Sequence, residues 1–199
     1  MRKLIYFVGA TIDGYIAGPD GRFDFFPLGD DLARHLAVAY PETLPSHVRG
    51  QLGIDAGNTR FDTVLMGRRT YQPALDAGIT SPYRHLRQYV VSRTRTETAD
   101  PEVALAPGDP VELVGQLKAE EGLDIWLCGG GELAGSLLPE IDELIVKRYP
   151  IAIGSGVPLF VAPFRPYPFA LTATRTFDSG AAVQTYTRIT RTHHDMPSP

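Results

Sequence analysis

Met66-Gly67-Arg68-Arg69-Thr70-Tyr71 and Cys128-Gly129-Gly130-Gly131-Glu132-Leu133 are the two stretches that decide the fold of this chain. Each follows a short apolar run typical of a strand, residues 63–66 and 124–127, and leads into a segment with helical character. Glycine at such a junction allows the backbone to approach a ligand closely. The helix start adds a partial positive charge. Two such junctions predict a ligand with more than one phosphate, and a dinucleotide fits that description.

The composition is typical of a globular protein and excludes several functions. Of the 199 residues, 43% are hydrophobic and 21% are charged, which is the usual range. The formal net charge of −4 argues against broad nucleic-acid binding, because that function needs a basic face. No run approaches the ~20 apolar residues of a membrane span. Cys128 is the single cysteine, so no intrachain disulfide can form, and we expect a cytoplasmic protein.

The order of the predicted elements indicates the class of fold. We expect strands at 4–10, 63–66, 88–92, 124–127 and 143–149, with a hairpin over 169–177 and 182–189. An antiparallel hairpin that closes a β-α-β series predicts a three-layer α/β/α domain with a mostly parallel mixed sheet. We expect one domain over residues 1–190 and a flexible tail over 191–199.

Five helices are predicted from capping and periodicity. The first begins at Asp30-Asp31, which could cap it, and stops at Pro41; the second follows Pro45 and directs Val48, Leu52 and Ile54 toward the core. A short helix near 70–77 would be capped by Thr70, with Pro73 in its first turn. Two further helices begin after Asp109 and over 131–138.

The arginines beside these junctions indicate an anion site. Arg68 and Arg69 lie next to a helix start, where cations are unfavourable unless an anion joins them. Ser92 and Arg93 follow a predicted strand, and ligands of open α/β sheets bind beyond the carboxyl ends of strands. A hydroxyl and a guanidinium there could hold a ribose phosphate. The structural alternatives are a solvated arginine pair and an ordinary surface loop.

The triple glycine also allows two other interpretations. Gly129, Gly131 and Gly135 approximate the Rossmann dinucleotide fingerprint, but that motif normally lies in the first βαβ unit with an acidic residue ~20 positions further on. A tight turn for packing a helix on a strand is the simpler alternative. The histidines lack metal-ligand spacing, so no metal site is predicted. Cys128 is expected to be a small buried hydrophobe.

The ordered set of motifs resembles the dihydrofolate reductase-like superfamily. It is most similar to the branch that contains the reductase domain of bifunctional riboflavin-biosynthesis proteins, the RibD C-terminal domain. The resemblance spans roughly residues 2–190. The motifs that carry it are Thr11-x-Asp13-Gly14-x-Ile16-Ala17, residues 62–71, Val91-Ser92-Arg93, Gly129-Gly130-Gly131, Asp142-Glu143-Leu144 and residues 154–160.

The resemblance implies that NADPH lies across the strand ends. The stretches Gly67 to Thr70 and Gly129 to Leu133, including Glu132, would hold the pyrophosphate. The adenosine 2′-phosphate, and with it a preference for NADPH over NADH, would depend on Arg68, Arg69, Ser92 and Arg93. The nicotinamide would be bordered by Gly9, Ala10 and Ile16.

The family also implies a hydride transfer that needs a proton source. Dihydrofolate reductases use a carboxylate on the first helix, for which Asp31 is the counterpart here, although Asp31 could instead be a helix cap. Asp13 lies beside the nicotinamide loop and is the second candidate. A raised pKa in a closed site would suit either role.

We therefore expect an NADPH-dependent reductase of a small heterocycle or its ribose phosphate. It is most similar to 5-amino-6-(5-phosphoribosylamino)uracil reductase, but without the zinc deaminase domain. The alternatives are a pterin reductase of the dihydrofolate reductase type, a non-catalytic NADPH-binding protein, and a Rossmann oxidoreductase. The partner is a small-molecule substrate. A homodimer is also possible, because an exposed strand edge near the C-terminal hairpin could pair.

Overall fold

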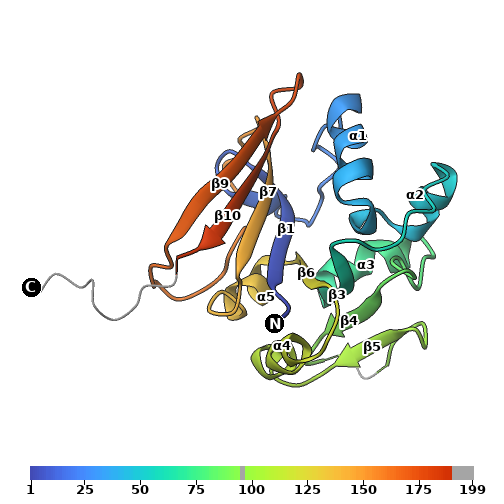
Figure 1. Cartoon of the computed structure of the whole chain (residues 1–199). Helices are drawn as coiled ribbons and strands as arrows, with labels where there is room; N and C mark the ends of the chain where they lie inside the picture. The colour runs from blue at the N-terminus through green and yellow to red at the C-terminus, as the bar shows by residue number, and fades with distance from the viewer. Residues whose placement is uncertain (95–96, 190–199) are drawn as a thin grey trace, which may run out of the picture.

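A mixed eight-stranded sheet forms the middle layer of the protein (Figure 1). The structure, a computed structural model, describes residues 1–94 and 97–189, so the predicted tail at 191–199 lies outside the described residues. The strand order is β5-β4-β3-β6-β1-β7-β10-β9. All neighbouring pairs are parallel except those of β10 with β7 and β9. The strands are β1 Leu4–Thr11, β3 Phe61–Gly67, β4 Arg87–Val91, β5 Val103–Ala106, β6 Asp124–Gly129, β7 Glu143–Tyr149, β9 Phe169–Thr176 and β10 Ala182–Arg188.

Helices cover the two faces of this sheet. On one face, α1 (Asp30–Ala39) and α3 (Arg68–Asp76) contribute Leu32, Leu36 and Tyr71 to the first hydrophobic cluster. On the other face, α4 (Pro110–Ala119) and α5 (Gly131–Ser136) contribute Val114 and Leu133 to the second. The short elements α2 (Ser46–Gln51) and η1 (Pro41–Thr43) follow α1. The predicted three-layer α/β/α arrangement is confirmed.

The central strand β1 explains why both faces need cover. Ile5 and Phe7 belong to the first cluster, whereas Leu4, Tyr6 and Val8 belong to the second. A strand that is apolar on both faces is typical of a parallel sheet between two helical layers. The predicted hairpin is also confirmed, with Ala182 opposite Thr176 and Arg188 opposite Phe169.

The predicted start of α3 was wrong. The helix begins at Arg68 with Gly67 as its N-cap, so Thr70 lies inside the first turn and forms no cap. Pro73 consequently lies in the helix interior and not in its first turn. By contrast, α4 begins as predicted, since the Asp109 carboxylate accepts a 2.8 Å hydrogen bond from the Val111 N–H.

The second helix was only partly predicted. It follows Pro45 as expected, but Leu52 is exposed and Arg49 is the buried residue of this helix. The Arg49 guanidinium donates to the carbonyls of Pro41 and Ala56, which explains how a charged side chain can be buried there. Three short strands were not predicted: β5, and the pair formed by β2 (Tyr15–Ala17) with β8 (Val157–Pro158).

Candidate functional site

The site is defined by the place where β1 and β6 stop pairing. The two strands pair only over Leu4–Tyr6 with Ile125–Leu127, whereas β1 pairs with β7 as far as Thr11. Just beyond the end of the ladder, the Trp126 indole N–H donates to the Phe7 carbonyl at 3.1 Å. The chain after β1 leads to β3 on one side, and the chain after β6 leads to β7 on the other. Such a switch point is where open α/β sheets bind ligands.

The two glycine junctions meet beside this switch point. A Cβ atom added to Gly67 would lie 3.4 Å from both the Gly129 carbonyl oxygen and the Gly130 nitrogen. One added to Gly130 would lie 3.6 Å from the Thr70 hydroxyl and 4.0 Å from Ile16 Cδ1. Gly129 has φ +133°, and the peptide bond between Gly129 and Gly130 is cis. The chain therefore brings Gly67, Thr70, Ile16 and the triple glycine together.

Both helices that follow the junctions begin at this point. Glycine is the N-cap of each, Gly67 for α3 and Gly130 for α5, so no N-cap side chain accepts the first-turn N–H groups. Arg69 and Glu132 face each other across the two helix starts at 3.7 Å. Their side chains are 77% and 71% exposed, so this ion pair contributes little to stability. Arg68 is also exposed, which leaves both guanidinium groups accessible to an anion.

Ser92 and Arg93 directly follow β4, the parallel neighbour of β3, and so lie at the same carboxyl-terminal end of the strands as the Gly67 junction. Ser92 is buried, and its Oγ accepts a hydrogen bond from the Thr94 N–H at 3.3 Å. Arg93 is exposed. Of the residues expected near the nicotinamide, Gly9 is on the first-cluster face of β1 and Ala10 is buried in the second cluster.

The two predicted carboxylates hold loops in place. Asp13 accepts hydrogen bonds from the N–H groups of Ile153 and Gly154 at 3.0 and 2.8 Å. Asp31 accepts from the Asp178 N–H at 2.8 Å and therefore ties α1 to the turn of the C-terminal hairpin. It is not the N-cap of α1, since that position is Gly29.

Neither carboxyl has the raised pKa that a proton donor would need. A hydrogen bond from Thr11 and bonds from the backbone lower the pKa of Asp13. A backbone bond from Asp178 lowers the pKa of Asp31. Both groups are therefore ionised at neutral pH; Asp13 is exposed and Asp31 is half-buried.

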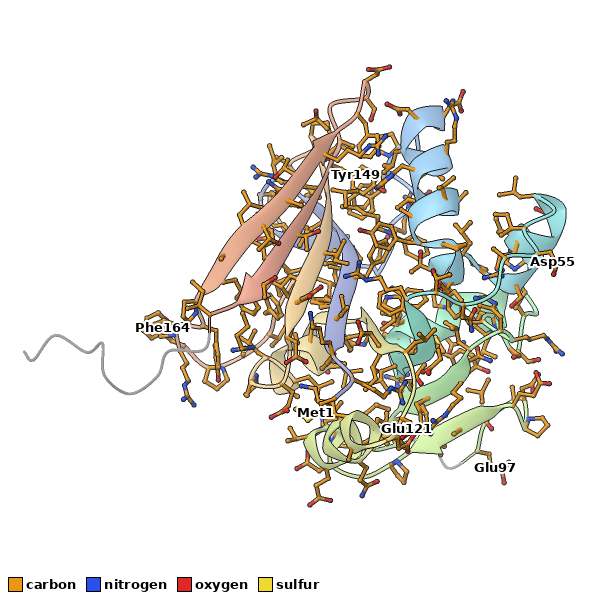
Figure 2. The ribbon with its side chains drawn as sticks, in the orientation of Figure 1. Met1, Asp55, Glu97, Glu121, Tyr149 and Phe164 are labelled. Atoms are coloured by element: carbon orange, nitrogen blue, oxygen red, sulfur yellow. The ribbon has the colours of Figure 1, made fainter. Side chains whose placement is uncertain are left out.

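Lys147 is the residue near this site that the sequence reading missed. It is opposite Gly9 in the β1–β7 ladder, and its Cε would lie 3.9 Å from a Cβ on Gly9. Its ammonium is 4.6 Å from the centroid of the Phe7 ring. Tyr149, two residues further along β7, lies between the sheet and α1 (Figure 2). The sequence did contain a signal for this residue. Ile145, Lys147 and Tyr149 are alternate residues of one strand and share a face, and a lysine between two apolar neighbours on such a face is unusual.

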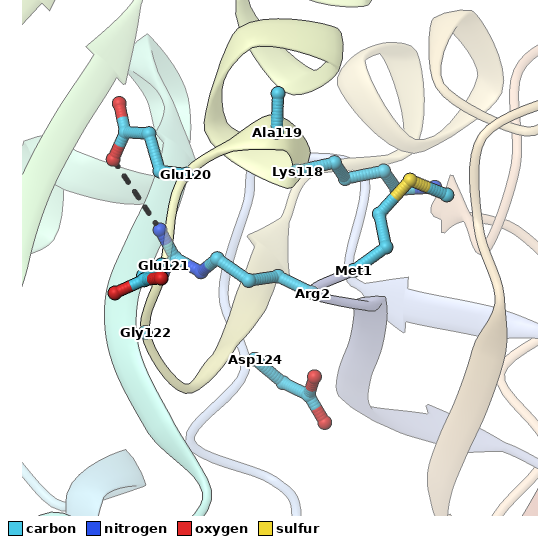
Figure 3. Close-up of a pocket in the computed structure, with 8 residues that line it drawn as sticks. All are labelled: Met1, Arg2, Lys118, Ala119, Glu120, Glu121, Gly122 and Asp124. Carbon is cyan, nitrogen blue, oxygen red and sulfur yellow. Dashed lines mark ion pairs between the residues drawn. The ribbon is translucent and has the colours of Figure 1, made fainter.

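A hollow of about 580 Å³ lies at the other end of the strands, where β1 and β6 begin (Figure 3). Its lining includes charged groups that already have partners, and Arg2 pairs with Glu120, which also lines the hollow, at 3.5 Å. Arg2 pairs with Asp62 and donates to the Thr63 hydroxyl at 2.7 Å, and Lys118 pairs with Asp142 at 2.8 Å. Because ligands of such sheets bind at the carboxyl ends of strands, we assign this hollow to structure and not to function.

Other kinds of site are not supported within residues 1–94 and 97–189. No group of histidine, cysteine and acidic side chains there could hold a metal ion. No helix in the same ranges has the length and apolar character needed to cross a membrane. Burial raises the pKa of the Cys128 thiol to about 12, which agrees with a packed side chain and not with a nucleophile.

The fold and the glycine-lined switch point define a dihydrofolate reductase-like α/β domain. The chain belongs to the RibD C-terminal domain family, whose model matches residues 2–183. A relative over nearly the whole chain is the uncharacterized protein YwjB of Bacillus subtilis strain 168. It is 29% identical over 185 residues, which are 92% of this chain and 95% of that protein.

Three solved structures share the fold. A protein of Shewanella sp. PV-4, provisionally named as a riboflavin biosynthesis protein, has a TM-score of 0.69 at 26% identity, covering 96% of this chain and 100% of that chain. Dihydrofolate reductase from Enterococcus faecalis, complexed with NADP(H), has a TM-score of 0.63 at 16% identity, covering 94% and 96%. A deaminase/5-amino-6-(5-phosphoribosylamino)uracil reductase from Thermotoga maritima has a TM-score of 0.61 at 15% identity, covering 94% and 57%.

Proposed function

We propose that this protein is an NADPH-dependent reductase that transfers hydride to a small heterocycle or its ribose phosphate. The observation that carries the proposal is the contact between the two glycine junctions at the switch point. Gly67 and Gly129 to Gly130 are more than sixty residues apart in the chain, yet their backbones lie against each other. Two helix starts meet there, and each favours an anion. A pyrophosphate between them would receive N–H groups from both.

The residues at the site fit the rest of the cofactor. Arg68 and Arg93 are exposed near the ends of neighbouring strands, where they could bind the 2′-phosphate that distinguishes NADPH from NADH. Ile16 and Gly9 border the switch point, where the nicotinamide would lie. When bound, the cofactor would supply the hydride. The task of the protein is then to hold the substrate in register and to exclude water.

Family membership and the named neighbours support the type of reaction. One structure of the same fold is named as a uracil-derivative reductase and another as dihydrofolate reductase complexed with NADP(H). Of these two, we propose a substrate similar to 5-amino-6-(5-phosphoribosylamino)uracil. Asp31, the expected counterpart of the pterin-binding carboxylate, is bonded to the hairpin backbone, which argues against a pterin.

The two arginines provide a direct test of the cofactor. Arg68→Ala and Arg93→Ala are each expected to weaken NADPH binding by roughly tenfold to a hundredfold, because a charge-assisted hydrogen bond to phosphate contributes about 1.5–3 kcal/mol. Binding of NADH, which lacks the 2′-phosphate, should change by less than about twofold. Fluorescence titration with each cofactor measures both affinities.

Arg165→Ala is the matched control for these two variants, since Arg165 is another exposed arginine but lies over Tyr167 near the C-terminal hairpin. It should leave both affinities unchanged. An unaltered ratio of NADPH to NADH affinity in Arg68→Ala and in Arg93→Ala would contradict the proposed cofactor site.

A homodimer is the second part of the proposal. Strand β9 is the outermost strand of the sheet, and most of its residues are exposed. Its free edge can pair with another strand, and Leu171 adds apolar surface with 54% of its area exposed. Light scattering of the purified chain would distinguish the dimer from a monomer.

A further inference from the structure

Lys147 is a charged residue in a mostly apolar part of the protein. Its side chain projects from β7 and is half-buried, with its ammonium over the Phe7 ring of the neighbouring strand β1. Within the described residues, the Cys128 thiol is the one ionisable group that affects the pKa of Lys147, and no carboxylate does so. Burying a cation without a carboxylate is costly. A cation–π contact with phenylalanine offsets only part of this cost.

The position of Lys147 links it to the proposed nicotinamide site. Gly9, which borders that site, has no side chain, and its open face is closed by Lys147, Tyr149 and Phe26. Phe26 stacks on Tyr149 with ring centroids 4.6 Å apart. A planar ligand that entered beside Gly9 would stack on these rings or displace Phe26. In either case the Lys147 ammonium would be the charged group nearest to the ligand on this face of β1.

The other titratable groups on this face of the sheet cannot balance the charge of Lys147. Cys128 projects from β6 and is hydrogen-bonded to Tyr83, and Tyr149 is on the same strand as Lys147. His35 on α1 packs against Phe177. Burial raises the pKa of Cys128, Tyr83 and Tyr149, so all three are neutral near neutral pH. Burial lowers the pKa of His35. None of these groups can neutralise an ammonium.

We propose that Lys147 determines substrate specificity by binding an anionic or carbonyl oxygen of a planar heterocycle. This inference rests on the proposed function and narrows its substrate class. A site of the opposite charge, with a buried carboxylate, would select a ring that presents N–H donors or a positive charge. Lys147 offers donors only. It therefore favours oxo-substituted pyrimidines over diamino-substituted ones.

Two simple ligands test the charge of this site without turnover. The barbiturate anion carries ring oxygens, whereas 2,4-diaminopyrimidine binds as its cation. In calorimetric titrations of the protein with NADP⁺, barbiturate should bind to the wild type and lose roughly tenfold or more of its affinity in Lys147→Met, the loss expected for one charge-assisted hydrogen bond. The diaminopyrimidine should bind more weakly than barbiturate to the wild type.

The pH dependence gives a second readout that a packing role would not produce. Burial lowers the pKa of Lys147 to about 8. Barbiturate affinity should therefore fall as the pH rises through about 8, because the ammonium loses its charge while the ligand keeps its own. Lys147→Arg should restore binding and remove this dependence, since arginine stays protonated.

Arg148→Met is the matched control, because Arg148 is the exposed neighbour of Lys147 on β7 and points to the other face. It should bind barbiturate like the wild type. Equal barbiturate affinity in the wild type and Lys147→Met, no barbiturate binding at all, or a preference for the diaminopyrimidine would each overturn the inference. Each titration is repeated without NADP⁺, so failure of NADP⁺ to bind would count against the proposed function and not against Lys147.

Discussion

Gly131→Ala is expected to destabilise the protein by about 1–3 kcal/mol or more and to abolish cofactor binding. A Cβ atom at this position would overlap the carbonyl oxygen of Pro158 in β8, which is backbone and cannot turn away. The start of α5 would have to separate from the β2–β8 pair, and overpacking of this kind costs about 1–3 kcal/mol or more. The first-turn N–H groups of α5 would move with it. Urea denaturation and NADPH titration measure the two effects.

Gly115→Ala provides the contrast. Gly115 is inside α4, and nothing lies within 4 Å of a Cβ placed there. Alanine should stabilise this helix by about 0.8–1 kcal/mol, because it is the better helix former. Cofactor affinity should not change. If Gly131→Ala unfolded at the same urea concentration as the wild type, the close contact between α5 and β8 would be wrong.

Arg2→Met is expected to lower the free energy of unfolding by about 3–5 kcal/mol, the cost of removing one partner of a buried ion pair. The Arg2 side chain is 2% exposed and binds Asp62, the Thr63 hydroxyl and the Leu123 carbonyl. These contacts join the first strand to β3 and to the start of β6. Methionine fills similar space but leaves the acceptors without their donor.

This effect should be confined to stability. The Arg2 contacts lie where the strands begin, and the glycine junctions lie where they end. The folded fraction of Arg2→Met should therefore bind NADPH with wild-type affinity. Arg22→Met is the control, because the Arg22–Asp24 pair is about two-thirds exposed on both sides. Its stability should change by no more than about 0.5 kcal/mol. A selective loss of NADPH affinity in Arg2→Met would show that the hollow there has a role in binding.

The layer architecture could be predicted because it depends on local patterns. Apolar strands, glycine junctions and the alternating hairpin each occur within a few consecutive residues. The elements that were missed depend on distant partners. Strand β8 is a strand only because Val157 and Pro158 meet β2, and Arg49 is buried only because the carbonyls of Pro41 and Ala56 accept its donors. Neither partnership leaves a local signal.

The candidate site divides in the same way. Glycines and arginines at strand ends could be selected from sequence, since their chemistry follows from backbone geometry. The proton-donor candidates could not be selected in this way, because the pKa and the hydrogen bonds of a carboxylate depend on its neighbours in the folded protein. Asp13 and Asp31 are bound to backbone N–H groups of segments more than one hundred residues away. Lys147 becomes notable only once β7 is next to Gly9 of β1.

The most direct test of the central claim is the transfer of deuterium from 4-deuterated NADPH to 5-amino-6-ribosylaminouracil 5′-phosphate, followed by mass spectrometry of the product. We expect one deuterium in the product with NADPH, and much slower transfer with deuterated NADH. An absence of transfer to this compound would reject it as the substrate. If the chain in addition bound NADPH no more tightly than NADH, the assignment as an NADPH-dependent reductase would be contradicted.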